Sequence, residues 1–191
     1  YSEGTVDLEY NFPFGWGELW GIASRTSYDL GKHMEFSGKK LEYQDPETKE
    51  KYVPYVVEPA LGLNRLFLAV LCDAYAVEDA GTKEQRVLLK LHPDLSPVKA
   101  GIFPLVKKDG LPEIAEKLYR DLAKHWPVDY DTSGNIGKRY YRQDELGTPF
   151  CITVDYDSKE DQKATVRERD SKSQERVSLD QMVNYIRDRL D

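Results

Sequence analysis

The sequence has no apolar run near the ~20 residues that a helix needs to cross a bilayer, and few residues suited to holding a transition metal. Its two cysteines, Cys72 and Cys151, lie far apart, and none of its three histidines stands at ligand spacing from a cysteine or another histidine. This pattern disfavours a zinc site and a disulfide framework. Because sparse cysteine also fits a reducing compartment, we expect a cytoplasmic protein.

Several signatures of nucleotide-binding and hydrolytic proteins are missing as well. The sequence contains no GxxxxGK[ST] phosphate loop, no GxGxxG, no GxSxG and no HExxH, so those classes lack support. Positive charge is not in excess, since 27 Lys and Arg stand against 34 Asp and Glu, for a formal net charge of −7. Binding of nucleic acid over the whole surface is therefore disfavoured, but a local basic groove is compatible with this charge.

The composition is that of a globular chain. With 191 residues, of which 40% are hydrophobic and 32% charged, the chain can form one large domain or two small ones. It begins at Tyr1 with neither an initiator methionine nor a secretory signal, and we expect it to be part of a longer protein.

The first half predicts antiparallel sheet followed by a helix. Alternating and aromatic residues indicate extended structure over 5–22, and segments 39–44 and 50–58 flank a proline turn, which predicts a hairpin. From Pro59 to about Tyr75, apolar residues recur all around a helical wheel, as in a buried helix. The polar stretch 78–85 follows and is typical of a linker, so we predict domains at 1–84 and 85–191.

The second half alternates strands and helices. This order predicts a small α/β domain with a mixed sheet, whose last two strands form a hairpin around Ser171–Ser173. Ser178 is expected to cap the last helix. The predicted strands are 100–105, 128–130, 150–156, 164–169 and 174–177, and the predicted helices are 111–124, 136–145 and 179–190.

Glu18 lies in a glycine-rich strand. The alternation of side chains places it on one face with Trp16, Trp20 and Ile22. Glycines on the other face allow a ligand to approach closely, or they allow tight packing against another backbone. Glu18 is then either a ligand-binding acid or a core carboxylate paired with a cation.

Three further charged residues stand where burial or binding is expected. Arg25 offers a planar fork for a carboxylate or phosphate, but it could equally pair with Asp29 at the surface. Glu58 closes a valine-rich strand, and Arg65 begins an apolar helix. They form either a structural ion pair or the wall of a site for a charged ligand.

A short helix of the second half mixes basic and aromatic residues. Lys138 and Arg142 share one helical face, and Arg139 and Gln143 share another. Such a patch could hold phosphates while neighbouring groups contact unpaired bases. The alternative is an ordinary solvated face, since Asp144 and Glu145 follow directly.

Several long motifs, taken together, resemble one family. In the first half they are Phe12-Pro13-Phe14-Gly15-Trp16-Gly17-Glu18-Leu19-Trp20-Gly21-Ile22-Ala23, Arg25-Thr26, Tyr28-Asp29-Leu30 and Glu58-Pro59-Ala60-Leu61-Gly62-Leu63-Asn64-Arg65. In the second half they are Leu95-Ser96-Pro97-Val98-Lys99, Gly134-Asn135-Ile136-Gly137-Lys138 and Gly147-Thr148-Pro149-Phe150. The chain resembles the C-terminal part of bacterial homodimeric glycyl-tRNA synthetases of class II, with the end of the catalytic sheet, motif 3 and the anticodon-binding domain.

The resemblance implies the cofactors ATP and Mg²⁺ and the partners tRNA(Gly), glycine and ATP, in a homodimeric parent. It implies that Arg65 and Glu18 are catalytic, with Glu18 acting on the triphosphate through Mg²⁺. The ATP-binding residues it implies are Glu18, Leu19, Gly62, Leu63, Asn64 and Arg65. The glycine-binding residues it implies are Arg25 towards the carboxylate, Glu58 towards the ammonium, and Pro59, Ala60, Leu61 and Gly62.

The chain departs from the family pattern in three respects. Ala60 stands where the family usually has serine, and Asn64 where it often has aspartate. Nothing resembles motifs 1 and 2, so we expect no aminoacylation by this chain alone. The alternative is a non-catalytic module of the same fold, like the synthetase-like accessory subunit of mitochondrial DNA polymerase, but the presence of Arg25, Glu58 and Arg65 argues against it.

We predict that the second half binds tRNA in a salt-dependent manner. Affinity for tRNA(Gly) should fall steeply between two salt concentrations, because phosphate contacts release counterions. The residues expected to contribute are Lys138, Arg139, Arg142 and Gln143, so Arg139→Ala or Arg142→Ala should weaken binding. Equal affinity of both variants and the parent in a filter-binding titration would place the tRNA surface elsewhere.

Overall fold

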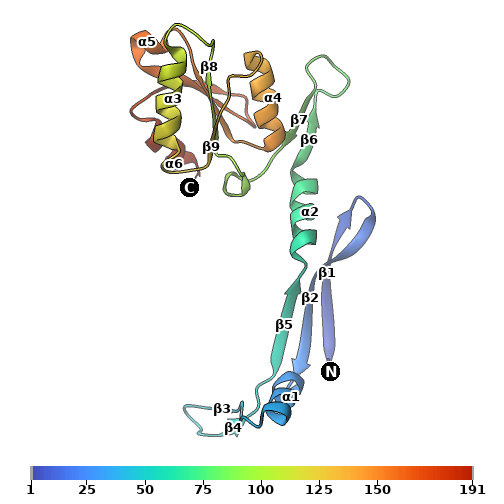
Figure 1. Cartoon of the computed structure of the whole chain (residues 1–191). Helices are drawn as coiled ribbons and strands as arrows, with labels where there is room; N and C mark the ends of the chain where they lie inside the picture. Colours follow the sequence, from blue (N-terminus) through green and yellow to red (C-terminus); the bar gives the residue numbers. More distant parts are fainter. Residues whose placement is uncertain (1, 191) are drawn as a thin grey trace. The chain divides into compact units, whose positions relative to one another are not determined.

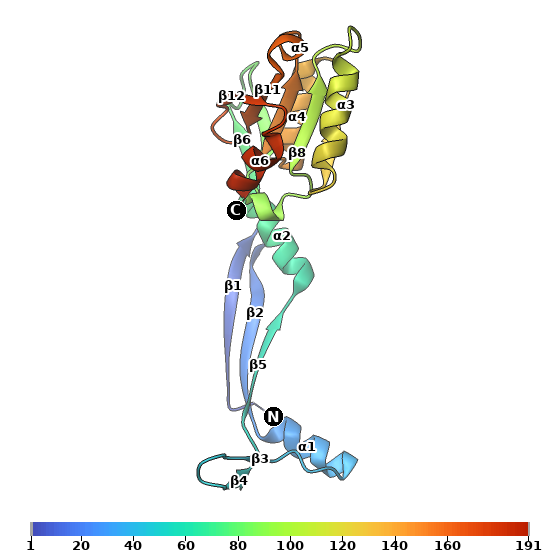
Figure 2. The same cartoon turned by 90° about the vertical axis from the view of Figure 1, so that its left-hand side faces the viewer.

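The computed structural model describes residues 2–190, and the chain divides into two compact units, residues 1–72 and 73–191. Figure 1 and Figure 2 label their helices and strands. Among the described residues, no helix is long and apolar enough to span a membrane. The same residues contain no group of three or more His, Cys, Asp or Glu that could hold a metal ion.

The first unit is built on a three-stranded antiparallel sheet. Its strands are β1 (Gly4–Phe12), β2 (Gly15–Thr26) and β5 (Val56–Leu61), in the order β1-β2-β5. Helix α1 (Tyr28–Ser37) follows β2, and β3 (Tyr43–Gln44) pairs with β4 (Lys51–Tyr52). The predicted hairpin is confirmed only as this short ribbon, because 56–58 pair with β2 instead.

The helix predicted from Pro59 begins later than expected. Pro59 lies in β5, and α2 runs from Leu63 to Ala74. A proline is tolerated there because β5 is the edge strand of this sheet, where a missing N–H costs no ladder bond. The prediction of an all-round buried helix is also wrong, since Ala69 and Ala74 are buried while Phe67 is 65% exposed.

The second unit is a mixed α/β domain, as predicted. Its sheet has the order β12-β11-β10-β8-β9, with β8 parallel to both β9 and β10. Helices α3 and α6 cover one face and α4 the other (Figure 1). The elements are β6 (Tyr75–Glu78), β7 (Arg86–Leu89), β8 (Ala100–Pro104), α3 (Leu111–Leu122), β9 (Val128–Tyr130), α4 (Ile136–Leu146), β10 (Phe150–Val154), α5 (Ser158–Asp161), β11 (Lys163–Glu168), β12 (Gln174–Ser178) and α6 (Met182–Leu190), with a 3₁₀ turn at Pro93–Leu95.

Two local predictions for this unit need correction. The stretch 78–85 includes the turn of the β6–β7 hairpin, and because backbone bonds tie β6 to β7, the division between the units falls earlier, after Cys72. Ser178 does not cap the last helix. It is the last residue of β12, and α6 begins only at Met182.

The core of the second unit lies between its sheet and helices α3 and α6. Aliphatic residues from the sheet and from α3 and α6 are fully excluded from solvent, among them Ile102, Leu111, Leu122, Ile152, Met182 and Ile186. Burial of each such side chain contributes about 1.5–3 kcal/mol. The unit therefore provides a rigid support for the surface of α4.

Two glycines with the same backbone conformation give a matched test of this packing. Gly147 ends α4 and Gly110 precedes α3, each with φ of 79°. A Cβ on Gly147 would lie 3.0 Å from the carbonyl oxygen of Leu89, whereas a Cβ on Gly110 would meet nothing within 4 Å. Gly110→Ala should cost about 1–2 kcal/mol of unfolding free energy, and Gly147→Ala about 1–3 kcal/mol more. Urea denaturation measures both; equal losses would contradict the close packing at Gly147.

Candidate active site and nucleic-acid interface

Strand β2 carries a β-bulge that redirects its side chains. The pairing with β1 skips Leu19, so the alternation of side chains shifts by one residue at that point. Glu18 consequently shares a face with Gly21, where an added Cβ would lie 3.1 Å from the Glu18 carboxylate oxygen. The prediction that Trp20 and Ile22 lie beside Glu18 is wrong, because the bulge moves them to the opposite face.

The face that Glu18 occupies gathers most of the charged residues of this sheet. Asp7 and Ala60 are the cross-strand partners of Gly21, and Glu58 is the partner of Ala23 two residues further on. Directly opposite residues place their side chains on the same face. We call this side of the sheet the charged face, defined by Asp7, Glu9 opposite Glu18, Glu18, Gly21, Ala23, Glu58 and Ala60.

The absence of a side chain at Gly21 gives the carboxylates of the charged face their space. The position of a Gly21 Cβ would be 3.1 Å from Glu18 Oε1 and 3.4 Å from Asp7 Oδ1. Two carboxylates therefore meet over one glycine. Sequence reasoning missed Asp7, because only the strand register brings it to Glu18.

The opposite face is apolar. Pro59 is paired with Ile22 and Leu61 with Trp20, which places these four side chains away from Glu58 and Ala60. The side chains of Pro59 and Leu61 therefore do not line the site that was predicted for them. Other residues of this face are also open to solvent, with Val6 64% and Val57 64% exposed.

Arg25 joins the charged face through a second irregularity. The pairing with β5 skips Arg25, and Thr26 adopts a φ of 52°. The Arg25 guanidinium contacts Glu58, with Nε 3.0 Å from Oε2, and it also donates to both carboxylate oxygens of Asp29, at 2.5 and 2.6 Å. The hydrogen bond from Arg25 lowers the pKa of Asp29. The predicted alternative of an Arg25–Asp29 pair is thus present, together with the contact to Glu58.

Arg65 is attached to the bulge rather than to Glu58. Its Nη1 donates to the backbone carbonyl of Glu18, and the N–H of Gly62 donates to the carbonyl of Leu19 at 3.4 Å. A Glu58–Arg65 ion pair is therefore not the arrangement in this structure. The start of α2, whose first residues Leu63 and Asn64 are exposed, is therefore held beside the bulge.

In the second unit, two of the predicted tRNA-binding residues are buried. Arg139 is 2% exposed and Gln143 1% exposed. The Arg139 guanidinium donates to the carbonyls of Pro104, Thr132, Ser133 and Gly134. Gln143 donates to Asp129 at 2.6 Å and accepts from Thr148. Both side chains hold loops to the sheet, and we correct their assignment as direct RNA contacts.

The other face of α4 is open. Lys138 and Tyr141 are exposed, and Arg142 is 42% exposed while pairing with Asp131. Burial by itself raises the pKa of Asp131. Hydrogen bonds from the Ser133 N–H and the Arg142 guanidinium lower it by more, so the pKa of Asp131 is lowered overall. Arg142 is thus partly neutralised in place. Tyr141 is an exposed aromatic that the sequence reasoning did not single out.

The two acidic residues at the end of α4 differ, because Glu145 is exposed as the alternative supposed whereas Asp144 is buried. Asp144 is 1% exposed and lies 3.2 Å from Arg167 and 3.4 Å from Arg86. These buried charges link α4 to β7 and β11. No spacing along the chain indicates this cluster, because its members are far apart in sequence.

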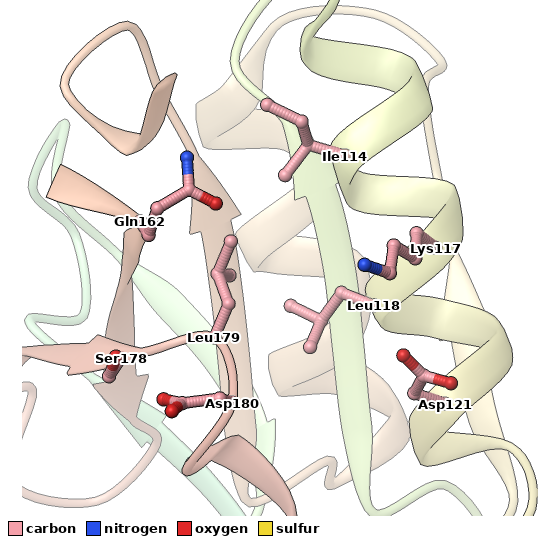
Figure 3. A pocket seen from close by; sticks show the side chains of 8 residues that line it. All are labelled: Ile114, Lys117, Leu118, Asp121, Gln162, Ser178, Leu179 and Asp180. Atoms are coloured by element: carbon pink, nitrogen blue, oxygen red, sulfur yellow. The ribbon is translucent and has the colours of Figure 1, made fainter. Parts of the chain in front are cut away.

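A cleft of about 590 Å³ opens on the α3 and α6 side of the second unit (Figure 3). Its polar groups are partly engaged, since Gln162 donates to backbone carbonyls of α5 and Asp121 pairs with Lys124. The residues that line it are Ile114, Lys117, Leu118, Asp121, Gln162, Ser178, Leu179 and Asp180. None of the residues predicted for a site lies among them.

Comparison with known proteins first defines the class. Residues 99–189 match the family model of the anticodon binding domain. A solved structure of the RNA binding domain of threonyl-tRNA synthetase from Cryptosporidium parvum shares the fold. It has a TM-score of 0.67 at 19% identity and covers 96% of this chain and 42% of its own.

The whole chain is, more particularly, a relative of bacterial glycine–tRNA ligases. It is 56% identical over 190 residues to the enzyme of Caldanaerobacter subterraneus and 55% identical over 191 residues to that of Clostridium tetani. The enzyme of Staphylococcus haemolyticus is 53% identical over 191 residues. In each case all of this chain is covered, and it spans 41% of the relative's length.

The buried position of Arg139 predicts that its replacement acts on stability. Arg139→Ala leaves buried carbonyls unpaired and should cost about 3 kcal/mol or more of unfolding free energy. Lys138→Ala, one residue away on the exposed face, should change it by about 0.5 kcal/mol or less. Denaturant titration of both variants checks this, and a stable Arg139→Ala protein would show that its bonds to the loop carbonyls are dispensable.

Proposed function

We propose that the protein containing this chain is a glycine–tRNA ligase, which activates glycine with ATP and transfers it to tRNA(Gly). The observation that carries the proposal is the pairing of Arg25 with Glu58, at 3.0 Å on the charged face, in a chain that resembles glycine–tRNA ligases throughout its length. A cation and an anion in contact match the two charges of a free amino acid.

Arg25 and Glu58 would bind the two ends of glycine. The guanidinium suits the carboxylate and Glu58 suits the ammonium. Around them the charged face carries the small residues Gly21, Ala23 and Ala60. Gly21 is already closed in by two carboxylates, so exclusion of larger amino acids would be steric. Pro59, Leu61 and Gly62 would contribute backbone only.

Arg65 would face the triphosphate of ATP, with the backbone of Gly62 and Leu19 beside it. Its attachment to the Glu18 carbonyl fixes the guanidinium near the bulge. A preorganised cation stabilises the charge that develops at phosphate without reorganisation during the reaction. Leu63 and Asn64 belong to the same turn and complete the proposed nucleotide surface.

The residues on the charged face fit a magnesium ion bound together with ATP. Glu18 and Asp7 offer carboxylate oxygens on the same side of Gly21. Mg²⁺ usually takes one or two carboxylates and fills its other positions with water and phosphate oxygens. We propose Glu18, assisted by Asp7, as its protein ligands, and the ion would neutralise polyphosphate charge.

The second unit would bind the anticodon stem and loop of tRNA(Gly). Lys138 and Arg142 remain as candidate phosphate contacts on α4, and Tyr141 offers an aromatic surface for an unpaired base. We propose that the chain comprises the end of a catalytic domain followed by an anticodon-binding domain. The exposed apolar face of the first unit is compatible with cover from the remainder of a longer, homodimeric, cytoplasmic enzyme.

The test is glycine-dependent exchange of pyrophosphate into ATP by the full-length protein. Arg65→Ala should reduce kcat/KM by about 100-fold or more, because the guanidinium that would stabilise the developing phosphate charge is lost. Lys32→Ala is the matched control, since Lys32 pairs with Glu35 at the surface of α1, away from the charged face. Normal exchange by Arg65→Ala would refute the role of Arg65, and no glycine-dependent exchange by the parent would refute the function.

A further inference from the structure

The position of Arg25 is set by a residue with no assigned role, Asp29. Arg25 Nε lies 2.5 Å from Asp29 Oδ2 and Nη2 lies 2.6 Å from Oδ1, which is a two-point contact. Side-by-side bonds of this kind fix the plane of a guanidinium as well as its place. Both side chains are largely shielded, at 21% and 24% exposed.

Asp29 and Glu58 use the same nitrogen of Arg25. Nε carries one hydrogen, yet it lies 2.5 Å from Asp29 Oδ2 and 3.0 Å from Glu58 Oε2. A single N–H cannot be aligned well with both carboxylates, so the shorter contact to Asp29 is the stronger one. Glu58 is 47% exposed and is the partner that can leave at lower cost.

The backbone between the two residues enforces this geometry. The register between β2 and β5 shifts at Arg25, and Thr26 has a φ of 52°, which a β-branched residue rarely adopts. Helix α1 then starts at Tyr28, so Asp29 lies in its first turn, four residues after Arg25. Strained backbone of this kind persists where the surrounding structure holds it in place.

We propose that Asp29 is a positioning residue for glycine binding. It rests on the proposed function: Asp29 holds the Arg25 guanidinium over the charged face while Glu58 exchanges its contact with Arg25 for the ammonium of glycine. The carboxylate of glycine then takes the place of Glu58 beside Arg25. Asp29 touches neither substrate nor ATP, and it acts through Arg25 alone.

Loss of the Asp29 charge should affect the KM for glycine and not the KM for ATP. In the full-length protein, Asp29→Asn keeps the size of the side chain but removes the charge and one acceptor of the two-point contact. The KM for glycine in pyrophosphate exchange should rise by about ten- to a hundredfold. The KM for ATP should stay within about twofold, because Arg65 and Glu18 are not contacted by Asp29.

Two further variants separate positioning from a general loss of structure. Asp29→Glu restores the charge and should recover part of the glycine KM. Glu35→Gln removes a carboxylate of the same helix that pairs at 2.7 Å with Lys32, and should leave both constants unchanged. If Asp29→Asn does not fold, Asp29→Glu becomes the test. Its KM for glycine should then rise by a smaller factor than expected for Asp29→Asn, while its KM for ATP stays normal.

The outcomes distinguish this inference from the proposed function. A parent protein without glycine-dependent exchange refutes the function and the inference together. A working parent with an unchanged glycine KM in Asp29→Asn refutes the inference alone. Equal increases of both KM values, or no recovery in Asp29→Glu, would show a structural role and would also overturn it.

Discussion

The β-bulge at Leu19, where the β1–β2 register skips one residue, decides which side chains of the first unit meet. By shifting the alternation, it turns Glu18 towards Asp7 and away from Trp20, and it leaves the Glu18 and Leu19 carbonyls to bind Arg65 and Gly62. The placement of the residues that we propose to bind ATP and Mg²⁺ therefore depends on one bulge. Regular pairing through Leu19, without the bulge, would place Glu18 on the apolar face beside Trp20.

A second irregularity, at Arg25 and Thr26, complements the first. The bulge at Leu19 sets the carboxylates of the charged face, and the turn at Thr26 brings a guanidinium between two more of them. Opposite charges placed next to small residues suit a small zwitterion. Both irregularities lie in β2, which is the central strand of its sheet.

The second unit uses buried charge for a different purpose. Arg139 satisfies loop carbonyls, and Asp144 pairs with Arg86 and Arg167. Removing one partner of such a group leaves an uncompensated buried charge or polar atom, which lowers the free energy of unfolding by about 3–5 kcal/mol. These residues stabilise the platform, and the residues left at its surface are those available to RNA.

Hydrophobic periodicity and turn residues determined the element types of the second unit, because its strands and helices are long enough to show a clear pattern, as at 100–104, 111–122 and 150–154. The motifs likewise determined the family. Periodicity could not reveal the bulge at Leu19, the extended Pro59 or the burial of Arg139 and Gln143. Each of these depends on which strand or loop lies opposite, and only the tertiary structure decides that partner.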